Sequence, residues 1–192
     1  MWYLNEKPEQ RWAWAKAFEP DHCEKIIQQS LCIPLERGKV ISDNPDGLDN
    51  TARISNIAWL SSDISGPFAW IYEHCAKVVA AVNKQFFNYE LDYLENLQFT
   101  VYDSAGSHFS KHVDNLSSAN KNRKLSFSVQ LSASETYTGG DLLLYNGEKP
   151  TYAVREQGYI NFFPSWTLHE VTPITSGTRY SLVGWCHGPK FK

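Results

Sequence analysis

Residues 102–115 have the sequence YDSAGSHFSKHVDN, which joins an apolar run ending at Tyr102 to a polar loop. The central motif of this stretch is His112-x-Asp114. Successive side chains of a β-strand point to opposite faces, so residues two apart lie on the same face. The motif therefore predicts one imidazole and one carboxylate that project together from a strand.

A third ligand for a metal ion is available later in the chain. Residues 162–171, with the sequence FFPSWTLHEV, contain His169. Two histidines and one carboxylate that leave coordination positions open form the facial triad of non-haem Fe(II) oxygenases. Arg179 follows on the next strand and can bind a carboxylate through two parallel hydrogen bonds. An HxD motif alone means little, but the four residues together predict a metal site beside an anion site.

The composition is that of an ordinary globular protein. The chain has 192 residues, of which 42% are apolar and 20% charged, so it is long enough for about one domain with a buried core. A formal charge of −3 gives no general attraction for nucleic acid or anionic membranes. There is no apolar run of the ~20 residues that a membrane helix needs, and the four cysteines show no CxxC spacing. We therefore expect a cytoplasmic protein without a nucleic-acid or membrane partner.

The hydrophobic pattern predicts helices first and strands later. One helix begins at Pro20 and ends before Pro34, and a stronger one follows Pro67 and ends near Phe87. From Leu91 onward the pattern alternates with period two between turn residues, as in a sandwich or jelly roll. The expected strands are residues 97–101, 125–131, 142–145, 151–154, 159–163 and 179–185. The predicted class is α+β, mainly β, with the N-terminal helices on one face of the sheet.

Three further segments of the N-terminal half have a predicted place. Residues 1–18, with Trp2, Trp12 and Trp14, are expected to form an edge strand or an arm on the body of the protein. Residues 41–50 are rich in turn formers and acids, so they predict either a plain surface loop or a lid over the site. Residues 53–60 alternate weakly and predict a strand, and residues 53–59 are expected to line the substrate entrance together with the loop 41–50.

Several motifs of residues 102–185 together have the pattern of a known enzyme family. They are Tyr102-x-x-x-Gly106 with Phe109, His112-Val113-Asp114-Asn115, residues 123–132 (RKLSFSVQLS), Tyr137-x-Gly139-Gly140-Asp141-Leu142, and the run from Phe163-Pro164-Ser165 through His169-Glu170-Val171 and Pro173-Ile174 to Gly177 and Arg179. This part of the chain resembles the Fe(II)- and 2-oxoglutarate-dependent dioxygenases of the prolyl 4-hydroxylase type, and most closely the small bacterial PKHD-type hydroxylases and oxygen-sensing prolyl hydroxylases.

The resemblance implies a fold and a set of cofactors. It implies a single dioxygenase domain over residues 1–192, in which residues 1–90 support a double-stranded β-helix of residues 91–192. It further implies Fe(II), 2-oxoglutarate and O2 as cofactors, with ascorbate as a candidate reductant. The implied metal ligands are His112, Asp114 and His169. The implied partners of 2-oxoglutarate are Arg179, which would bind its distal carboxylate, together with Tyr102, Gln130 and Trp185.

Two positions depart from the family pattern. Phe109 stands where many relatives have tyrosine, so a hydroxyl group is missing. Gln130 stands where oxygen-sensing relatives place a tyrosine that assists the arginine, and an amide can still hydrogen-bond a carboxylate there. Tyr102 is equally well explained as a core residue, and Trp185 as a wall beneath the co-substrate. His108 and His187 are not expected to bind the metal.

The leading hypothesis is a dioxygenase that hydroxylates a peptidyl side chain, with proline as the residue that the resemblance implies. The acids of residues 41–50 would then favour a peptide with nearby lysine or arginine. A second hypothesis keeps the chemistry but takes a free amino acid, another small molecule or a nucleobase as substrate. A non-catalytic jelly-roll binding module is a third, and a zinc hydrolase with the same ligands is a fourth, although it leaves Arg179 unexplained.

Overall fold

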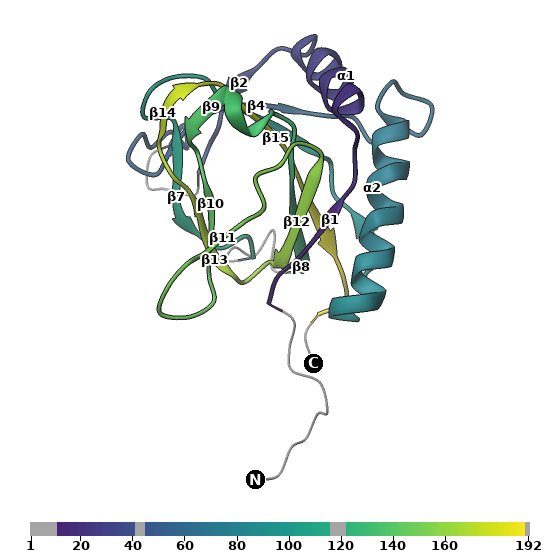
Figure 1. Cartoon of the computed structure of the whole chain (residues 1–192). Coiled ribbons are helices and arrows are strands. Elements are labelled where there is room, and N and C mark those ends of the chain that lie inside the picture. The colour runs from purple at the N-terminus through teal and green to yellow at the C-terminus, as the bar shows by residue number, and fades with distance from the viewer. Residues whose placement is uncertain (1–10, 41–44, 116–121, 191–192) are drawn as a thin grey trace.

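A computed structural model of the chain describes residues 11–40, 45–115 and 122–190. Within these ranges the protein is mainly β, as predicted, with two sheets of five or more strands and two long helices. Figure 1 shows the smaller sheet on one side of the molecule and the larger sheet between it and helix α2. Trp2, residues 41–44 and the N-terminal part of the predicted arm lie outside the described residues.

The larger sheet contains the long central strands of the fold, and all its described pairs are antiparallel. Its strand order is β1-β12-β8-β15-β6-β4-β2, and β5 also pairs with β15. The bounds are β1 Ala13–Lys16, β2 Glu36–Arg37, β4 Asn56–Trp59, β5 Tyr93–Leu94, β6 Gln98–Tyr102, β8 Arg123–Gln130, β12 Tyr159–Pro164 and β15 Arg179–His187. The part of the predicted arm that is described therefore forms the edge strand β1.

The smaller sheet has the order β11-β10-β13-β7-β3, and a separate pair joins β14 to β9. The bounds are β3 Arg53–Ile54, β7 His108–His112, β9 Tyr137–Gly139, β10 Leu142–Tyr145, β11 Thr151–Tyr152, β13 Leu168–Val171 and β14 Ile174–Gly177. Hydrophobic alternation did not give the bounds of β7, β9, β13 or β14, because these strands are short and mix polar with apolar residues. The HxD motif placed His112 and Asp114 on one strand, whereas β7 ends at His112 and Asp114 lies in the turn after it. Strand β7 carries His112, so the smaller sheet is one wall of the site.

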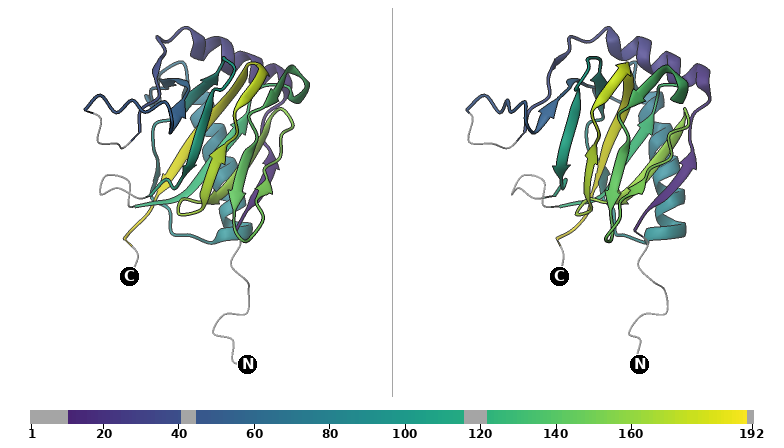
Figure 2. Two further views of the ribbon diagram at one scale, coloured as in Figure 1. Left: turned by 90° about the vertical axis from the view of Figure 1, so that its left-hand side faces the viewer. Right: turned by 60° about the vertical axis from the view of Figure 1, so that its left-hand side comes forward.

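The helices are α1 (Pro20–Leu31) and α2 (Ala69–Val82), and α2 continues as a π-helical turn over Asn83–Phe87. Their buried apolar side chains share one core cluster with those of β6, β8, β12 and β15. Figure 2 shows α1 running across one end of the strands and α2 behind them. A short 3-10 turn, Ser134–Thr136, precedes β9. Neither helix has the length and apolar character needed to cross a bilayer, among the residues described.

The central strands of the larger sheet bury both of their faces, but with different side chains. Phe99 and Val101 of β6 belong to the core cluster beneath the helices, whereas Gln98, Thr100 and Tyr102 line a pocket on the other face. Strand β8 repeats this arrangement, with Leu125, Phe127 and Val129 in the core and Ser126, Ser128 and Gln130 on the opposite face. Alternation along each strand thus separates a packing face from a chemical face.

The strand predicted over residues 53–60 is divided at Ser55. Arg53 pairs with Phe109 in the smaller sheet, whereas Asn56 pairs with Val101 in the larger one. The carbonyl of Ser55 accepts a hydrogen bond from the Gly38 backbone N–H, at 2.9 Å, where the chain passes from one sheet to the other. A pattern of apolar residues reports burial and not the sheet a residue joins, so this division left no signal in the sequence.

Candidate active site

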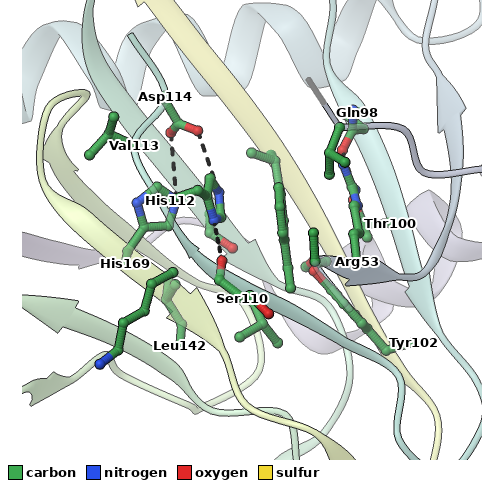
Figure 3. Close-up of a pocket in the computed structure, with 18 of the residues that line it drawn as sticks. Arg53, Gln98, Thr100, Tyr102, Ser110, His112, Val113, Asp114, Leu142 and His169 are labelled. Carbon is green, nitrogen blue, oxygen red and sulfur yellow. Dashed lines mark hydrogen bonds and ion pairs between the residues drawn. The ribbon is translucent and has the colours of Figure 1, made fainter. Parts of the chain in front are cut away.

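Three potential metal ligands meet where β7 and β13 run side by side. His112 is the last residue of β7, and His169 lies directly opposite it on β13. Asp114 lies in the turn just beyond the strand, where its backbone N–H donates to the Ser165 carbonyl at 2.9 Å. Its carboxylate faces both histidines, with each Nε2 atom 3.7 Å from one carboxylate oxygen (Figure 3). The three ligand atoms lie within 4.8 Å of one another, which suits one metal ion.

Both imidazoles present the correct nitrogen to this space. The Nδ1 atom of His112 contacts the carbonyl of Ser110 at 2.8 Å, and that of His169 contacts the carbonyl of Thr167 at 2.9 Å. A carbonyl only accepts hydrogen bonds, so Nδ1 carries the proton and Nε2 keeps its lone pair. Burial, reinforced by the charges of His169 and Arg53, lowers the pKa of His112 to about 3. The imidazole is therefore neutral near pH 7, as metal binding requires.

The carboxylate of Asp114 is held in place by a hydroxyl group on the chemical face of β8. Burial of Asp114 opposes its ionisation, but the two histidines and a hydrogen bond from Ser126 Oγ outweigh this and lower the pKa of Asp114. The Ser126 bond is 2.6 Å long, and Ser126 also contacts Ser165 Oγ at 2.9 Å. One carboxylate oxygen is thereby fixed, and the group stays ionised.

Replacing Ser126 by alanine is expected to weaken metal binding by about 10- to 100-fold, the usual effect of removing a partner of a metal ligand. The matched control is Ser128→Ala, on the same face of the same strand, because no described residue hydrogen-bonds the Ser128 side chain. Anaerobic titration with Fe(II), or with Mn(II) as a spectroscopic substitute, measures the affinity. Equal affinities of the two variants would show that the Ser126 hydrogen bond does not support the site.

Arg179 is a buried cation with unused hydrogen-bonding capacity. It is 1% exposed, and its NH2 group donates to Gln130 Oε1 at 2.9 Å. Its Nε and NH1 atoms are buried and have no hydrogen-bond partner in the described part of the chain. No described carboxylate lies within 4.0 Å of it. Because an unpaired buried charge is costly, these donors fit an anionic ligand.

The triad and Arg179 line a single pocket of about 470 Å³. Tyr102 is 3% exposed and lines the pocket, with its ring centroid 5.4 Å from the Arg179 guanidinium carbon. Trp185 also lines it and is covered by the Arg123 guanidinium, 4.1 Å from the ring centroid. Gln130 is not a lining residue and meets the site only through Arg179. The sequence therefore predicted residues that do cluster, although Gln130 supports the arginine instead of facing the open space.

Phe109 packs flat on His112, with ring centroids 3.6 Å apart and planes 15° from parallel. Its ring lies where a tyrosine would bring a hydroxyl group near the metal ligands, and it fixes the imidazole by packing alone. The two histidines not expected to bind a metal lie elsewhere. His108 contacts the carbonyls of Gly106 and Thr51, and His187 contacts Glu95.

Three residues near the site were not recognised from the sequence: Ser126, Arg53 and Arg123. Arg123 is part of a short basic sequence, residues 121–124 (KNRK). Its side chain donates two hydrogen bonds to Glu95, of 2.8 and 2.6 Å, and one to the Asp114 backbone carbonyl, of 3.3 Å. The only signal for Ser126 was the polar row of β8, which a solvent-facing strand would also show. Arg53 was expected near the entrance as part of a strand, but without a role of its own.

Comparisons with known proteins agree with this geometry. Residues 97–187 match a family model described as 2OG-Fe(II) oxygenase superfamily. A PKHD-type hydroxylase of Synechococcus sp. (strain CC9605) is 46% identical over 83 residues, which cover 43% of this chain and 37% of that protein. A PKHD-type hydroxylase of Crocosphaera subtropica is 32% identical over 98 residues, 50% of this chain and 44% of that protein. The matches thus span less than half the length of these relatives.

Solved structures show the same fold over nearly the whole chain. A prolyl-4-hydroxylase of Pseudomonas putida superposes with a TM-score of 0.73 and 19% identity, covering 94% of both chains. A second solved structure is a prolyl hydroxylase from Trichoplax adhaerens in complex with a peptide fragment of the hypoxia inducible factor oxygen degradation domain. It superposes with a TM-score of 0.75 and 20% identity, covering 93% of this chain and 84% of that one. The cofactors of the matched family are Fe(II), 2-oxoglutarate and O2, as predicted. Residues 97–187 are thus similar in sequence to the 2OG-Fe(II) oxygenase superfamily and to PKHD-type hydroxylases, and the chain shares its fold with solved prolyl hydroxylases.

Proposed function

We propose that the protein is an Fe(II)- and 2-oxoglutarate-dependent dioxygenase that hydroxylates a peptidyl side chain, with proline as the target residue. The observation that carries this proposal is the presence of the triad and an unpaired buried arginine in one pocket. A metal hydrolase needs the triad but has no use for the arginine. A binding module without catalysis needs neither, and a buried cation without a partner would only destabilise it.

The residues present fit both parts of the cofactor set. His112 and His169 offer the Nε2 atoms of their imidazoles and Asp114 an ionised oxygen, a donor set suited to Fe(II) that leaves coordination positions open. Arg179 offers two unused donors to the distal carboxylate of 2-oxoglutarate. When bound, Fe(II) and 2-oxoglutarate would activate dioxygen as the oxidant, so that one oxygen atom enters the hydroxyl group of the product and the other enters succinate, which forms from 2-oxoglutarate with loss of carbon dioxide.

The chain itself orients and shields these groups. Ser126 fixes one oxygen of Asp114, and Phe109 fixes the plane of His112 by stacking. Gln130 orients the Arg179 guanidinium, and Tyr102 packs beneath it. In this role Trp185 is a wall of the pocket that keeps water from the buried charges.

A peptide substrate is supported by the lining of the pocket and by a structural neighbour. The loop residues Lys39, Val40, Asp49 and Ala52 line the pocket together with strand β7, and an extended chain bound between them would have a strand to lie against. The Trichoplax adhaerens protein with the same fold was solved with a peptide. We propose that the loop residues Lys39, Val40, Asp49 and Ala52, together with the strand residues 53–59, border the substrate. We also propose that residues 1–192 act as one jelly-roll dioxygenase domain of the cytoplasm.

The decisive experiment measures conversion of 2-oxoglutarate to succinate by the Fe(II)-loaded protein, with and without a panel of proline peptides, and the mass gain of one oxygen in the peptide. Succinate that rises with a proline peptide, together with the mass gain, supports the proposal. Stimulation by a free amino acid or a nucleotide, with no response to any peptide, would retain the dioxygenase and refute the peptide substrate. Absence of succinate under every condition would refute both.

A further inference from the structure

A second buried arginine lies in the pocket. Arg53 is 6% exposed and stands on β3, the edge strand of the smaller sheet. Its Nε donates to Ser55 Oγ at 2.7 Å, and its NH2 donates to Gln98 Oε1 at 2.9 Å. Its NH1 donates to no group in the described ranges, and none of the carboxylates described there forms an ion pair with it. The guanidinium is therefore oriented by neutral groups while its charge stays uncompensated.

Arg53 lies close to the metal ligands. Its guanidinium carbon is 4.5 Å from the ring centroid of Phe109, whose other face stacks on His112. Guanidinium, phenyl ring and imidazole thus form one stack, so that a single aromatic ring separates Arg53 from a metal ligand. Arg53, Gln98 and Thr100 are grouped on one side of the pocket in Figure 3, and Asp114 and the two histidines on the other. A molecule that reaches the metal can touch Arg53 at the same time.

The charges around the pocket leave a positive excess for the substrate to balance. Fe(II) and Arg179 would carry three positive charges, and Asp114 with the 2-oxoglutarate dianion three negative ones, so these cancel. Arg123 is neutralised by Glu95. The remaining charged lining residues are Lys39, Arg53 and Lys111 against Asp49. The bound cofactors therefore leave the entrance positive.

The acids of the loop do not reverse this balance. Oδ1 of Asp49 accepts hydrogen bonds from the N–H and hydroxyl of Thr51, and Oδ1 of Asp46 accepts from the Leu48 N–H. Both carboxylates are thus engaged in turns of their own segment, whereas Asp43 lies outside the described residues. The positive lining of the pocket opposes the preference for a basic peptide that these acids suggested in the sequence, and that preference stays a prediction.

We infer that Arg53 binds a carboxylate of the substrate, and that the enzyme selects acidic over neutral substrates through it. This inference rests on the proposed function, because it names the chemistry of the substrate of that site. The carboxylate comes either from an acidic side chain near the target proline of a peptide or from the α-carboxylate of a free amino acid. A planar guanidinium already held by two bonds is well suited to a carboxylate, since little side-chain order remains to be lost.

A purely structural role for Arg53 predicts a different behaviour. Its bonds to Ser55 and Gln98 tie β3 to the larger sheet, so its removal is expected to reduce stability in either case. A structural tie, however, gives no reason for the wild-type protein to distinguish glutamate from glutamine in a substrate. The preference between two isosteric ligands therefore tests whether the pocket selects acids, and its loss in an Arg53 variant assigns the selection to Arg53 and not to Lys39 or Lys111.

The experiment uses acetylated, amidated hexapeptides with one proline, in which glutamate occupies each other position in turn, and their glutamine counterparts. Free proline and prolinamide form the second arm, which tests the α-carboxylate as the source. Succinate formation gives kcat/KM for each member of a pair. Anaerobic calorimetry with Mn(II) and 2-oxoglutarate gives the binding affinity without turnover. We expect at least one acidic member to exceed its neutral counterpart by about tenfold or more in both measurements.

The variants locate this preference. In Arg53→Gln, kcat/KM and affinity for the acidic ligand should lie within about twofold of those for its neutral counterpart. Arg53→Lys should retain part of the preference, because the positive charge stays while the two-pronged hydrogen bonding of the guanidinium is lost. The control is Arg37→Gln, an exposed arginine outside the pocket that should keep the wild-type ratio. Equal binding of acidic and neutral members by the wild-type protein in both arms would overturn the inference, even if Arg53→Gln fails to fold. Absence of succinate formation would refute the proposed function, while calorimetry would still decide the role of Arg53.

Discussion

Replacing His112 by alanine is expected to abolish Fe(II) binding and succinate formation together. The imidazole is one of three ligands, and its neutral Nε2 faces Asp114 at 3.7 Å with the opposite nitrogen tied to the Ser110 carbonyl. Loss of a partner of a ligand already costs about 10- to 100-fold in metal affinity, so loss of a ligand itself should cost more than about a hundredfold. Anaerobic metal titration and succinate assays on the same preparation measure both effects.

The control for this experiment is His108→Ala. His108 begins the same strand, but its ring contacts only backbone carbonyls and lies outside the group that can hold a metal. This variant should bind Fe(II) like the wild type, while some loss of stability is acceptable. Undiminished turnover in His112→Ala would contradict the metal site, and parallel loss in both variants would point to a general disturbance of β7.

Replacing Arg179 by alanine is expected to raise the 2-oxoglutarate concentration needed for half-maximal turnover by more than about thirtyfold. Truncating one partner of a buried, hydrogen-bonded charge pair typically costs about 2–5 kcal/mol, which corresponds to this factor or more. The arginine is 1% exposed, and two of its donors have no described partner. Steady-state kinetics and an anaerobic titration of 2-oxoglutarate measure the same change in two ways.

Arg179→Lys is the matched variant, because it keeps the charge and removes the fork that contacts Gln130. We expect a smaller rise in the 2-oxoglutarate requirement than for alanine, with Fe(II) affinity unchanged in both variants. An unchanged 2-oxoglutarate requirement in Arg179→Ala would mean that the co-substrate binds elsewhere. Arg53 would then be the next candidate, since it is the other arginine that lines the pocket without a carboxylate partner among the described residues.

The residues that the sequence singled out for the site lie close together in the structure. His112, Asp114, His169 and Arg179 were identified by residue type, spacing and resemblance, and the structure brings them into one pocket. The helices and the long strands were also predicted within a few residues, because apolar periodicity is strong where one face packs on a core. The HxD motif placed His112 on a strand, but the bounds of that strand, β7, were not predicted, because its burial is only partial and its residues are mostly polar.

The sequence could not distinguish a polar row that faces solvent from one that faces a pocket. Both produce the same alternation, so Ser126 and Gln98 had no recognisable role until the two sheets were seen to enclose them. Nor could it show that Arg53 leaves the larger sheet, since the division at Ser55 changes the pairing partner without changing hydrophobicity. Both limits have one cause, namely that pairing between distant strands is a property of tertiary structure.

The alternation along β6 and β8 has a consequence for how this protein can change over evolutionary time. Core residues and site residues occupy adjacent positions of the same strands, yet they face opposite sides and seldom contact each other. Point substitutions on the pocket side can therefore alter what is bound with little effect on packing, so new specificities are accessible in single steps. Insertions and deletions are not tolerated in the same way. Loss of one residue within β8 would turn the serines toward the helices and the phenylalanine toward the metal ligands. The pocket side of these strands can therefore vary in residue type, whereas the length of the strands cannot vary.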